Sequence, residues 1–170
     1  GVPDSDLAEL MKRLGDLALG QQRFSDALDY YQAVLAGKKA TRLEDDPQVA
    51  LAQLDVAQCL ILLNRPADAL PLAKPALESL RYAHGVGVVH EEVALALSVY
   101  GQSVLLVATK PKSVPAEQLE ALEMMERLHS ADAEALVPTL RALAVSYSKV
   151  SGGAAAAVEY GERVVAILPS

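Results

Sequence analysis

Residues 20–35 read GQQRFSDALDYYQAVL, and this stretch carries the local signals of a helical hairpin. Gly20 stands where a helix would end, and Phe24 to Asp26 stand where the next helix would begin. Within that next helix, Ala27 and Tyr31 are one turn apart and therefore share a face. The stretch predicts the turn and the second half of a helical hairpin.

The same arrangement of small residues recurs along the chain. First helices carry one small residue at steps of 42, 44 and 43 residues, at Gly15, Ala57, Gly101 and Ala144. Second helices carry another, at Ala27, Ala69, Ala121 and Ala157. Small side chains let two helices cross closely, and a hairpin hides its apolar face only by stacking on copies of itself. The period predicts four repeats, at about residues 5–36, 47–82, 90–129 and 132–168.

The breakers between apolar runs predict eight helices, at about 5–19, 24–36, 47–63, 67–82, 90–108, 115–129, 132–149 and 154–168. Asp46 followed by Pro47 reads as an N-cap and a first-turn proline. Pro75 falls inside a predicted helix, where we expect a kink because the ring removes one backbone hydrogen bond.

Composition supports an all-α protein and limits its partners. Hydrophobic residues make up 52% of the chain but aromatic residues only 4%, so Ala, Leu and Val dominate. The net charge of −7, with no basic stripe, argues against nucleic acid as a partner. No apolar run reaches the ~18 residues that a membrane span requires, so we expect no membrane insertion.

Cys59 is the single cysteine, and it lies in an apolar helical run. An intramolecular disulfide is therefore impossible, and a buried free thiol fits a reducing compartment. No signal segment opens the sequence. We expect a cytoplasmic protein.

These repeats resemble tetratricopeptide (TPR) repeats. The period near 43 residues, together with DPQVA at 46–50 and HEEVA at 90–94, resembles the longer repeats of kinesin light chains. The resemblance covers roughly residues 7–168. It implies a right-handed α-solenoid of about four TPR-like hairpins, forming one domain over residues 1–170 that is a fragment of a larger protein.

In that family the first helices line a concave groove that binds a peptide or helix of a partner. The matching positions here form a largely apolar set, namely Leu51, Leu54, Gln58, Ile61, Leu95, Ser98, Gln102, Leu105, Arg141 and Val145. Gln58 and Gln102 are equivalent and could hold an extended backbone, or could simply be polar surface. A neighbouring part of a longer chain is the alternative occupant. Lys12 fits the family's carboxylate clamp, but Asp16 replaces the expected Asn, which argues against that clamp.

The sequence suggests no catalytic or cofactor site. His84, His90 and His129 make no metal-ligand spacing with Cys59, since His84 and His90 are separated by a helix break. No Ser/His/Asp or Cys/His set stands at a suggestive spacing. We therefore expect a protein that is not an enzyme and that holds neither a metal ion nor a cofactor.

Three functional hypotheses follow. The first is a non-catalytic scaffold that binds a protein or peptide in the groove. The second is self-association, or an assembly module of a cytoskeletal, motor or ciliary complex. It draws on the uncapped last helix, whose Val158, Val164, Val165 and Leu168 would leave apolar surface for a homo-oligomer formed through solenoid ends. The third is a regulatory, peptide-sensing module of an enzyme.

Overall fold

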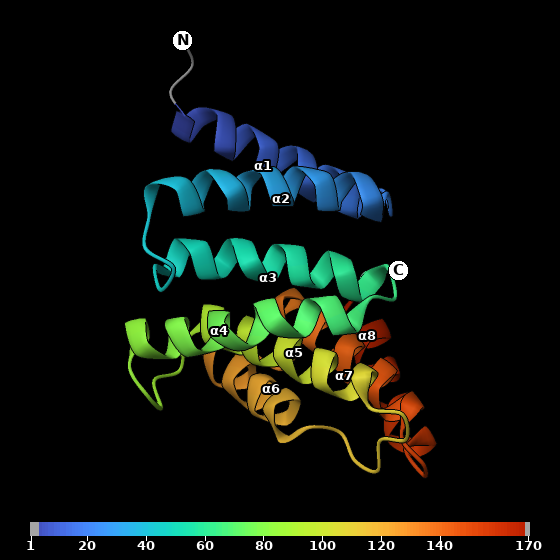
Figure 1. Cartoon of the computed structure of the whole chain (residues 1–170). Coiled ribbons are helices and arrows are strands. Elements are labelled where there is room, and N and C mark those ends of the chain that lie inside the picture. Colours follow the sequence, from blue (N-terminus) through green and yellow to red (C-terminus); the bar gives the residue numbers. More distant parts are fainter. Residues whose placement is uncertain (1–3, 169–170) are drawn as a thin grey trace. The chain divides into compact units, whose positions relative to one another are not determined.

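The computed structural model describes residues 4–168, and this part of the chain contains helices and no strand (Figure 1). The all-α class predicted from the sequence is confirmed. The helices are α1 (Asp4–Gly20), α2 (Phe24–Thr41), α3 (Pro47–Leu62), α4 (Pro66–His84), α5 (Glu91–Val107), α6 (Ala116–Leu128), the 3-10 helix η1 (Glu134–Leu136), α7 (Val137–Lys149) and α8 (Ala154–Ile167).

The chain divides into two compact units, the first ending at Ala83 and the second beginning at His84. Each unit holds two of the four predicted helical pairs. The first contains α1, α2, α3 and nearly all of α4, and the second contains α5 to α8. A single repeat domain over 1–170 stays a prediction, and its outermost residues, 1–3 and 169–170, lie outside the described residues.

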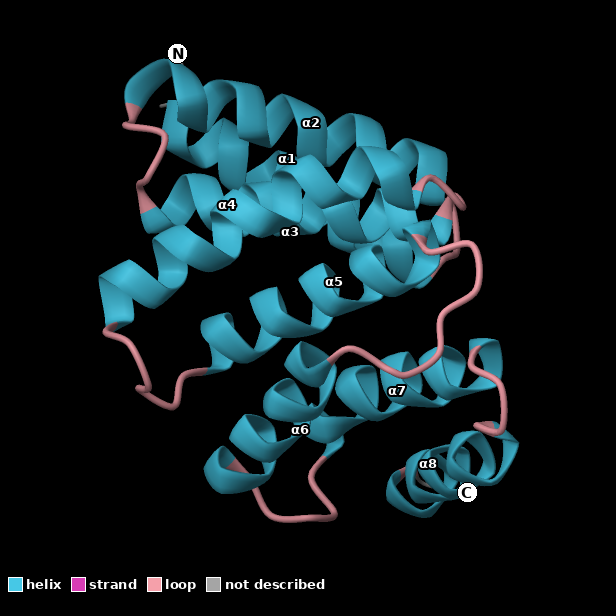
Figure 2. Ribbon diagram, turned by 60° about the horizontal axis from the view of Figure 1, so that its bottom comes forward, coloured by secondary structure: helices cyan, strands magenta, loops and turns pink. Residues whose placement is uncertain are grey.

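In the first unit α2 packs against both α1 and α3, and the three helices lie side by side in both views (Figure 2). The two hairpin turns repeat each other in detail. Arg23 N donates to Ala18 O, and Arg65 N donates to Leu60 O, both at 2.8 Å. Before each arginine stands a left-handed residue with φ of 59°, Gln22 in one turn and Asn64 in the other. The helix ends are therefore Schellman-like, with left-handed residues two positions past Gly20 and Leu62.

The small residues predicted at helix crossings lie in the core of this unit. Gly15 is buried against the ring of Tyr31, where an added Cβ would lie 2.6 Å from Cε1. Ala27, Ala57 and Ala69 have no exposed surface. The predicted close crossing is thus present between α1 and α2, and the small residues of α3 and α4 are buried as predicted.

In the second unit α5 packs on α6, α7 packs on α8, and α7 also contacts α5 and α6. Gly101 repeats the role of Gly15, because a Cβ there would lie 2.6 Å from Gln118 Cγ. Ala121 is fully buried. The fourth pair differs, since Ala144 and Ala157 are only half-buried. The small residues of the last pair are therefore less covered than the periodicity predicts.

Proline and cap positions explain where the helices begin. Asp46 caps α3, its carboxylate accepting from Gln48 N at 2.7 Å, and Pro47 is the first helical residue. Pro138 falls in the first turn of α7, after η1, so this helix begins later than the predicted 132. α4 continues through Pro71 and Pro75, both of which are exposed.

Between residues 4 and 168, no helix combines the length and the apolar character that crossing a membrane would require.

Candidate functional site

The predicted groove residues of the first unit lie on α3 and differ in exposure. Leu51, Gln58 and Ile61 are half-buried and reach the surface. Leu54 is only 1% exposed, so it belongs to the core and offers no accessible surface. α3 buries residues around most of its circumference, because other helices cover more than one of its faces. The stripe that remains accessible is therefore narrower than the sequence predicts.

The second unit shows the same division on α5 and α7. Leu95 and Val145 are 38% and 51% exposed, Arg141 is exposed and Gln102 is half-buried. Two further groove residues, Ser98 and Leu105, are 6% and 2% exposed and lie in the core. The Gln102 amide is turned towards Ser98, with its nitrogen 3.4 Å from the hydroxyl oxygen. Whether these residues and those of α3 form one groove stays a prediction.

A polar cluster that the sequence did not predict joins α1, α2 and α3. Lys12 Nζ lies 3.2 Å from Asp16 Oδ1 and 3.4 Å from Asp55 Oδ2. The Tyr31 hydroxyl donates to Asp16 at 2.6 Å, and the Lys12 ammonium lies 5.5 Å from the centre of the Tyr31 ring. We call Lys12, Asp16, Tyr31 and Asp55 the Lys12 cluster.

Burial and neighbouring charges act in opposite directions on the pKa values of Lys12 and Asp55. Burial raises the pKa of Asp55, although the charge of Lys12 works to lower it. Burial works to lower the pKa of Lys12, but the carboxylates of Asp55 and Asp16 outweigh it, so that pKa is raised. Burial and the bond to Asp16 raise the pKa of Tyr31. The tyrosine therefore stays a neutral donor, and the lysine stays a cation held at a fixed place.

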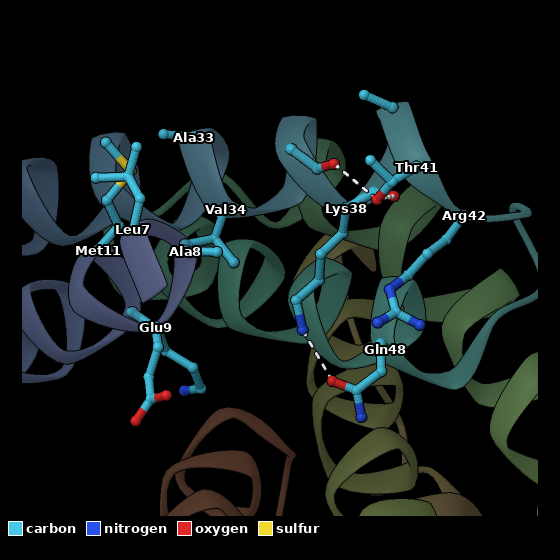
Figure 3. Close-up of a pocket in the computed structure, with 13 residues that line it drawn as sticks. Leu7, Ala8, Glu9, Met11, Ala33, Val34, Lys38, Thr41, Arg42 and Gln48 are labelled. Atoms are coloured by element: carbon cyan, nitrogen blue, oxygen red, sulfur yellow. Dashed lines mark hydrogen bonds between the residues drawn. The ribbon is translucent and has the colours of Figure 1, made fainter. Parts of the chain in front are cut away.

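Beside the Lys12 cluster lies a pocket of about 690 Å³, between α1, the end of α2 and the start of α3. Figure 3 shows Leu7 and Met11 at one end, and Lys38, Arg42 and Gln48 at the other. Further lining residues are mostly small or apolar, namely Ala8, Ala33, Val34, Gly37, Ala40 and Thr41, with Glu9 and Lys12. The pocket thus joins an apolar wall to three cations on a chain whose net charge is −7.

The three cations of the pocket differ in how they are paired. Lys12 is held by two carboxylates, and Arg42 Nη1 lies 3.1 Å from Asp46 Oδ2. Lys38 instead donates to the neutral amide oxygen of Gln48, at 2.9 Å. Burial, with the charges of Arg42 and Lys12 nearby, lowers the pKa of Lys38. Among the described residues that line the pocket, Lys38 is therefore the cation without a carboxylate partner, and it can donate a hydrogen bond to a carboxylate of a bound partner.

The sequence did not predict the pocket, because the residues at its polar end come from the end of a helix and the loop that follows it. α2 extends to Thr41, five residues past its predicted end, and the extension carries Lys38. The charges Lys38, Lys39 and Arg42 at the end of an otherwise acidic repeat were the available signal.

The single cysteine of the chain is not a candidate nucleophile. Cys59 is fully buried, and burial raises its pKa to about 11, so it is a neutral thiol at neutral pH. A reactive cysteine needs a lowered pKa and access to its substrate.

Comparison with known proteins agrees with the repeat pattern. Residues 6–81 match the family model described as tetratricopeptide repeat. The crystal structure of BtubC (BKLC) from P. vanneervenii is similar, with a TM-score of 0.59 and 18% identity, over 98% of this chain and 68% of that one. A crystal structure from Podosopora anserina, of putative kinesin light chain nearly identical TPR-like repeats, gives a TM-score of 0.45 and 17% identity, over 98% of this chain and 97% of that one. No curated protein matches the sequence.

The first unit combines paired helices, repeated turns and glycine-mediated crossings with the family match, and the structural neighbour extends the likeness of fold to the second unit. TPR domains are generally non-catalytic platforms for other proteins. The resemblance predicted from the repeats is confirmed, and residues 6–81 of this chain match the tetratricopeptide repeat family.

Proposed function

We propose that this chain is a non-catalytic interaction domain that binds a peptide or helix of a partner protein on the accessible faces of its first helices. In the first unit this face comprises Leu51, Gln58 and Ile61, and in the second Leu95, Gln102, Arg141 and Val145. Apolar side chains flanked by amide and charged groups suit a partner segment that is apolar on one side.

The pocket of the first unit supports a more specific partner. Gln48, Leu51, Asp55 and Gln58 recur at helical spacing on α3, so the pocket continues into the predicted face. We propose that an apolar side chain of the partner enters between α1 and α2, and that a neighbouring carboxylate of the partner replaces Gln48 as the acceptor for Lys38. The cation of Lys38 in a largely apolar pocket is the observation that carries this proposal.

Selection from a displayed peptide library would test this function. We expect selected peptides to carry an acidic residue beside apolar ones, and Lys38→Glu to weaken their binding about tenfold or more, because it opposes like charges. Lys39→Glu is the matched control, since Lys39 is exposed and does not line the pocket. Peptides without an acidic residue, or equal loss in both variants, would contradict the proposed contact.

A second variant tests the helix face itself. Leu51→Glu places a charge on the accessible stripe of α3 and should weaken the same peptides while far-UV circular dichroism stays unchanged. Leu54 is unsuitable because it is buried, and a charge there would disrupt the core. If binding survived Leu51→Glu, a different surface would have to be sought.

Self-association is a second candidate, favoured by the outer face of α8. Val158 and Val165 are 59% and 74% exposed and stand two helical turns apart, and Leu168 is 39% exposed. Val164, which was expected to join them, is buried at 7%. Analytical ultracentrifugation separates the two functions, because self-association appears without added peptide and should be lost in Val158→Glu/Val165→Glu.

The cytoplasm is the compartment that we propose. A buried, unpaired Cys59 is the supporting feature, since free thiols persist where the environment is reducing. Localisation of the chain fused to a fluorescent protein would test this.

A further inference from the structure

The three histidines of the chain all belong to the second unit and stand at helix ends. His84 is the last residue of α4, His90 is the N-cap of α5, and His129 is the C-cap of α6. His84 and His90, with Glu92, offer ligand atoms that all lie within 4.8 Å of one another. We propose that these three side chains form a binding site for a divalent metal ion of the zinc class.

The loop between the two histidines brings them together. Gly85 and Gly87 have φ of +96° and +80°, in the left-handed region that glycine adopts without strain. Val88 N donates to Gly85 O at 3.3 Å, which closes a turn. The imidazole rings of His84 and His90 consequently stack, with centroids 3.6 Å apart and planes 16° from parallel. The sequence spacing alone excluded such a site because it could not show this reversal.

The side chains of His84 and Glu92 already face each other, with two potential ligand atoms in contact. His84 Nε2 lies 2.7 Å from Glu92 Oε2, so a hydrogen bond joins the two atoms through one proton. A metal ion can take the place of that proton and use both lone pairs. Zinc–ligand bonds of about 2.0–2.2 Å require a modest opening of this contact, which side-chain rotation supplies. The side chains of His84 and Glu92 are 24% and 33% exposed, so the ion has a path from solvent.

The donor set selects the class of ion. Two imidazoles and one carboxylate suit Zn²⁺, or Co²⁺ as its spectroscopic substitute, whereas Mg²⁺ and Ca²⁺ prefer oxygen ligands. Three protein ligands leave the fourth tetrahedral position to water. The carboxylates of Glu91 and Glu92 at the start of α5 offset the dipole of that helix, which would otherwise oppose a cation.

The nearby His129 belongs to a different contact. Its Nε2 lies 2.6 Å from Glu91 Oε1, outside the group formed by His84, His90 and Glu92. His129 is therefore a matched control, being a histidine of the same unit that leaves the proposed ligands in place.

Metal binding should have a signature at the cap of α5. His90 Nδ1 accepts from the backbone N–H of Glu92 at 3.2 Å. Ligation through Nδ1 would use that lone pair, and ligation through Nε2 would place a proton on Nδ1. Either route ends the cap hydrogen bond, so the Glu92 amide resonance should move when metal is added.

The test uses the chain without a histidine tag, titrated with Co²⁺ for its visible absorption and with Zn²⁺ for thermal stability. We expect the absorption of tetrahedral Co²⁺ at one equivalent. Zn²⁺ at 100 times its Kd should raise Tm by about 5–10 °C. His84→Gln and Glu92→Gln should each lose about 10-fold or more in affinity, whereas His129→Gln should match the wild type. His90→Asn should also lose affinity while keeping a capping acceptor, which protects the helix.

Two results would overturn the site. One is a wild-type chain that shows neither Co²⁺ absorption nor a shift of the Glu92 amide with Zn²⁺. The other is retention of wild-type affinity in His84→Gln or His90→Asn. Circular dichroism of each variant identifies any loss caused by unfolding, and the amide shift is measured on the unaltered chain.

Discussion

Two helix crossings, one in each unit, both depend on a glycine but place different side chains against it. Gly15 in α1 and Gly101 in α5 occupy equivalent repeat positions, and each leaves room for a side chain of the following helix. A Cβ at either glycine would lie 2.6 Å from that side chain, Tyr31 in the first unit and Gln118 in the second. Glycine is thus required by a close approach at both places.

Tyr31 and Gln118 differ in whether their polar atoms find hydrogen-bond partners. The Tyr31 hydroxyl reaches Asp16 at the accessible edge of the helices, where Lys12 joins it. Gln118 is 1% exposed, and among the described residues neither its Oε1 nor its Nε2 finds a hydrogen-bond partner. The first crossing therefore connects the core to the proposed binding surface, whereas the second is closed within the core and carries an unsatisfied amide.

Alanine at the two glycines should have the largest effect. At Gly15 the added Cβ would meet three ring atoms of Tyr31 within 3.0 Å, and a ring cannot bend away. Overpacking of this kind costs about 1–3 kcal/mol, against ~1 kcal/mol gained in helix propensity. We expect Gly15→Ala to lower the free energy of unfolding by up to about 2 kcal/mol in urea denaturation. Gly101→Ala should cost less, because the nearest atom, Gln118 Cγ, lies in an aliphatic stem that can rotate, while the Gln118 backbone nitrogen at 3.3 Å is a milder contact.

Gly37 supplies the control for these substitutions. It lies in α2 with no atom within 4 Å of its Cβ position, so Gly37→Ala should stabilise the chain by about 0.5–1 kcal/mol through propensity alone. Stabilisation by Gly15→Ala of the same size would show that the crossing is roomier than the structure indicates.

Replacing Gln118 should have the next largest effect, with the opposite sign. Gln118→Met keeps the volume and the unbranched stem that fills the space beside Gly101, but removes two buried polar atoms without partners. Leaving such atoms unsatisfied costs about 1–3 kcal/mol, so we expect a stabilisation of about 1 kcal/mol by thermal or urea unfolding. A destabilised variant would mean that the amide is hydrogen-bonded in solution.

The crossings also show why so much of the fold could be predicted from the sequence. A small residue repeating near every 43 positions records a helix contact directly, because only small side chains fit there. Asp46 and Pro47 likewise mark a helix start by local chemistry alone. Periodicity could not show that the last crossing, at Ala144 and Ala157, is only half-buried, since burial depends on what covers the helices.

The candidate site was less predictable, for a physical reason. Family resemblance placed Leu54 and Leu105 in a groove, but helices covered on several faces bury residues that a surface helix would expose. Lys38 and Gln48 come from separate helices, and their pairing depends on how far α2 extends. His84 and His90 meet only because two left-handed glycines reverse the loop.

Removing the Tyr31 hydroxyl should have a smaller effect that is confined to the first unit. Tyr31→Phe keeps the ring against Gly15 and deletes only the donor to Asp16. Since Asp16 is half-exposed and water can replace the donor, we expect a loss of about 0.5–1 kcal/mol by urea denaturation. Lys12 loses part of its fixed position, so affinity for selected peptides should fall as well. If stability and peptide affinity were both unchanged, the Lys12 cluster would have no part in the proposed function.

The smallest expected effect is a pH dependence that the second unit should not share. Asp55 has Val99 as its equivalent in α5, which is 2% exposed and does not titrate. Burial raises the pKa of Asp55, so the folded chain binds this proton more tightly than the unfolded chain does. Its contribution to stability is therefore complete below pH 3.8, the ordinary value, and is lost as pH rises through the higher pKa of the folded state.

Asp55→Asn removes this titrating group and therefore tests whether Asp55 makes the chain less stable as pH rises. The free energy of unfolding of the wild type, relative to this variant, should fall as pH is raised from 3.8 towards neutrality. Asp29→Asn, at an exposed aspartate of α2, controls for the change in net charge and should run parallel to the wild type. A relative stability that rises with pH instead would mean that Lys12 outweighs burial at Asp55, and that the cluster is held by its ion pair rather than strained by it.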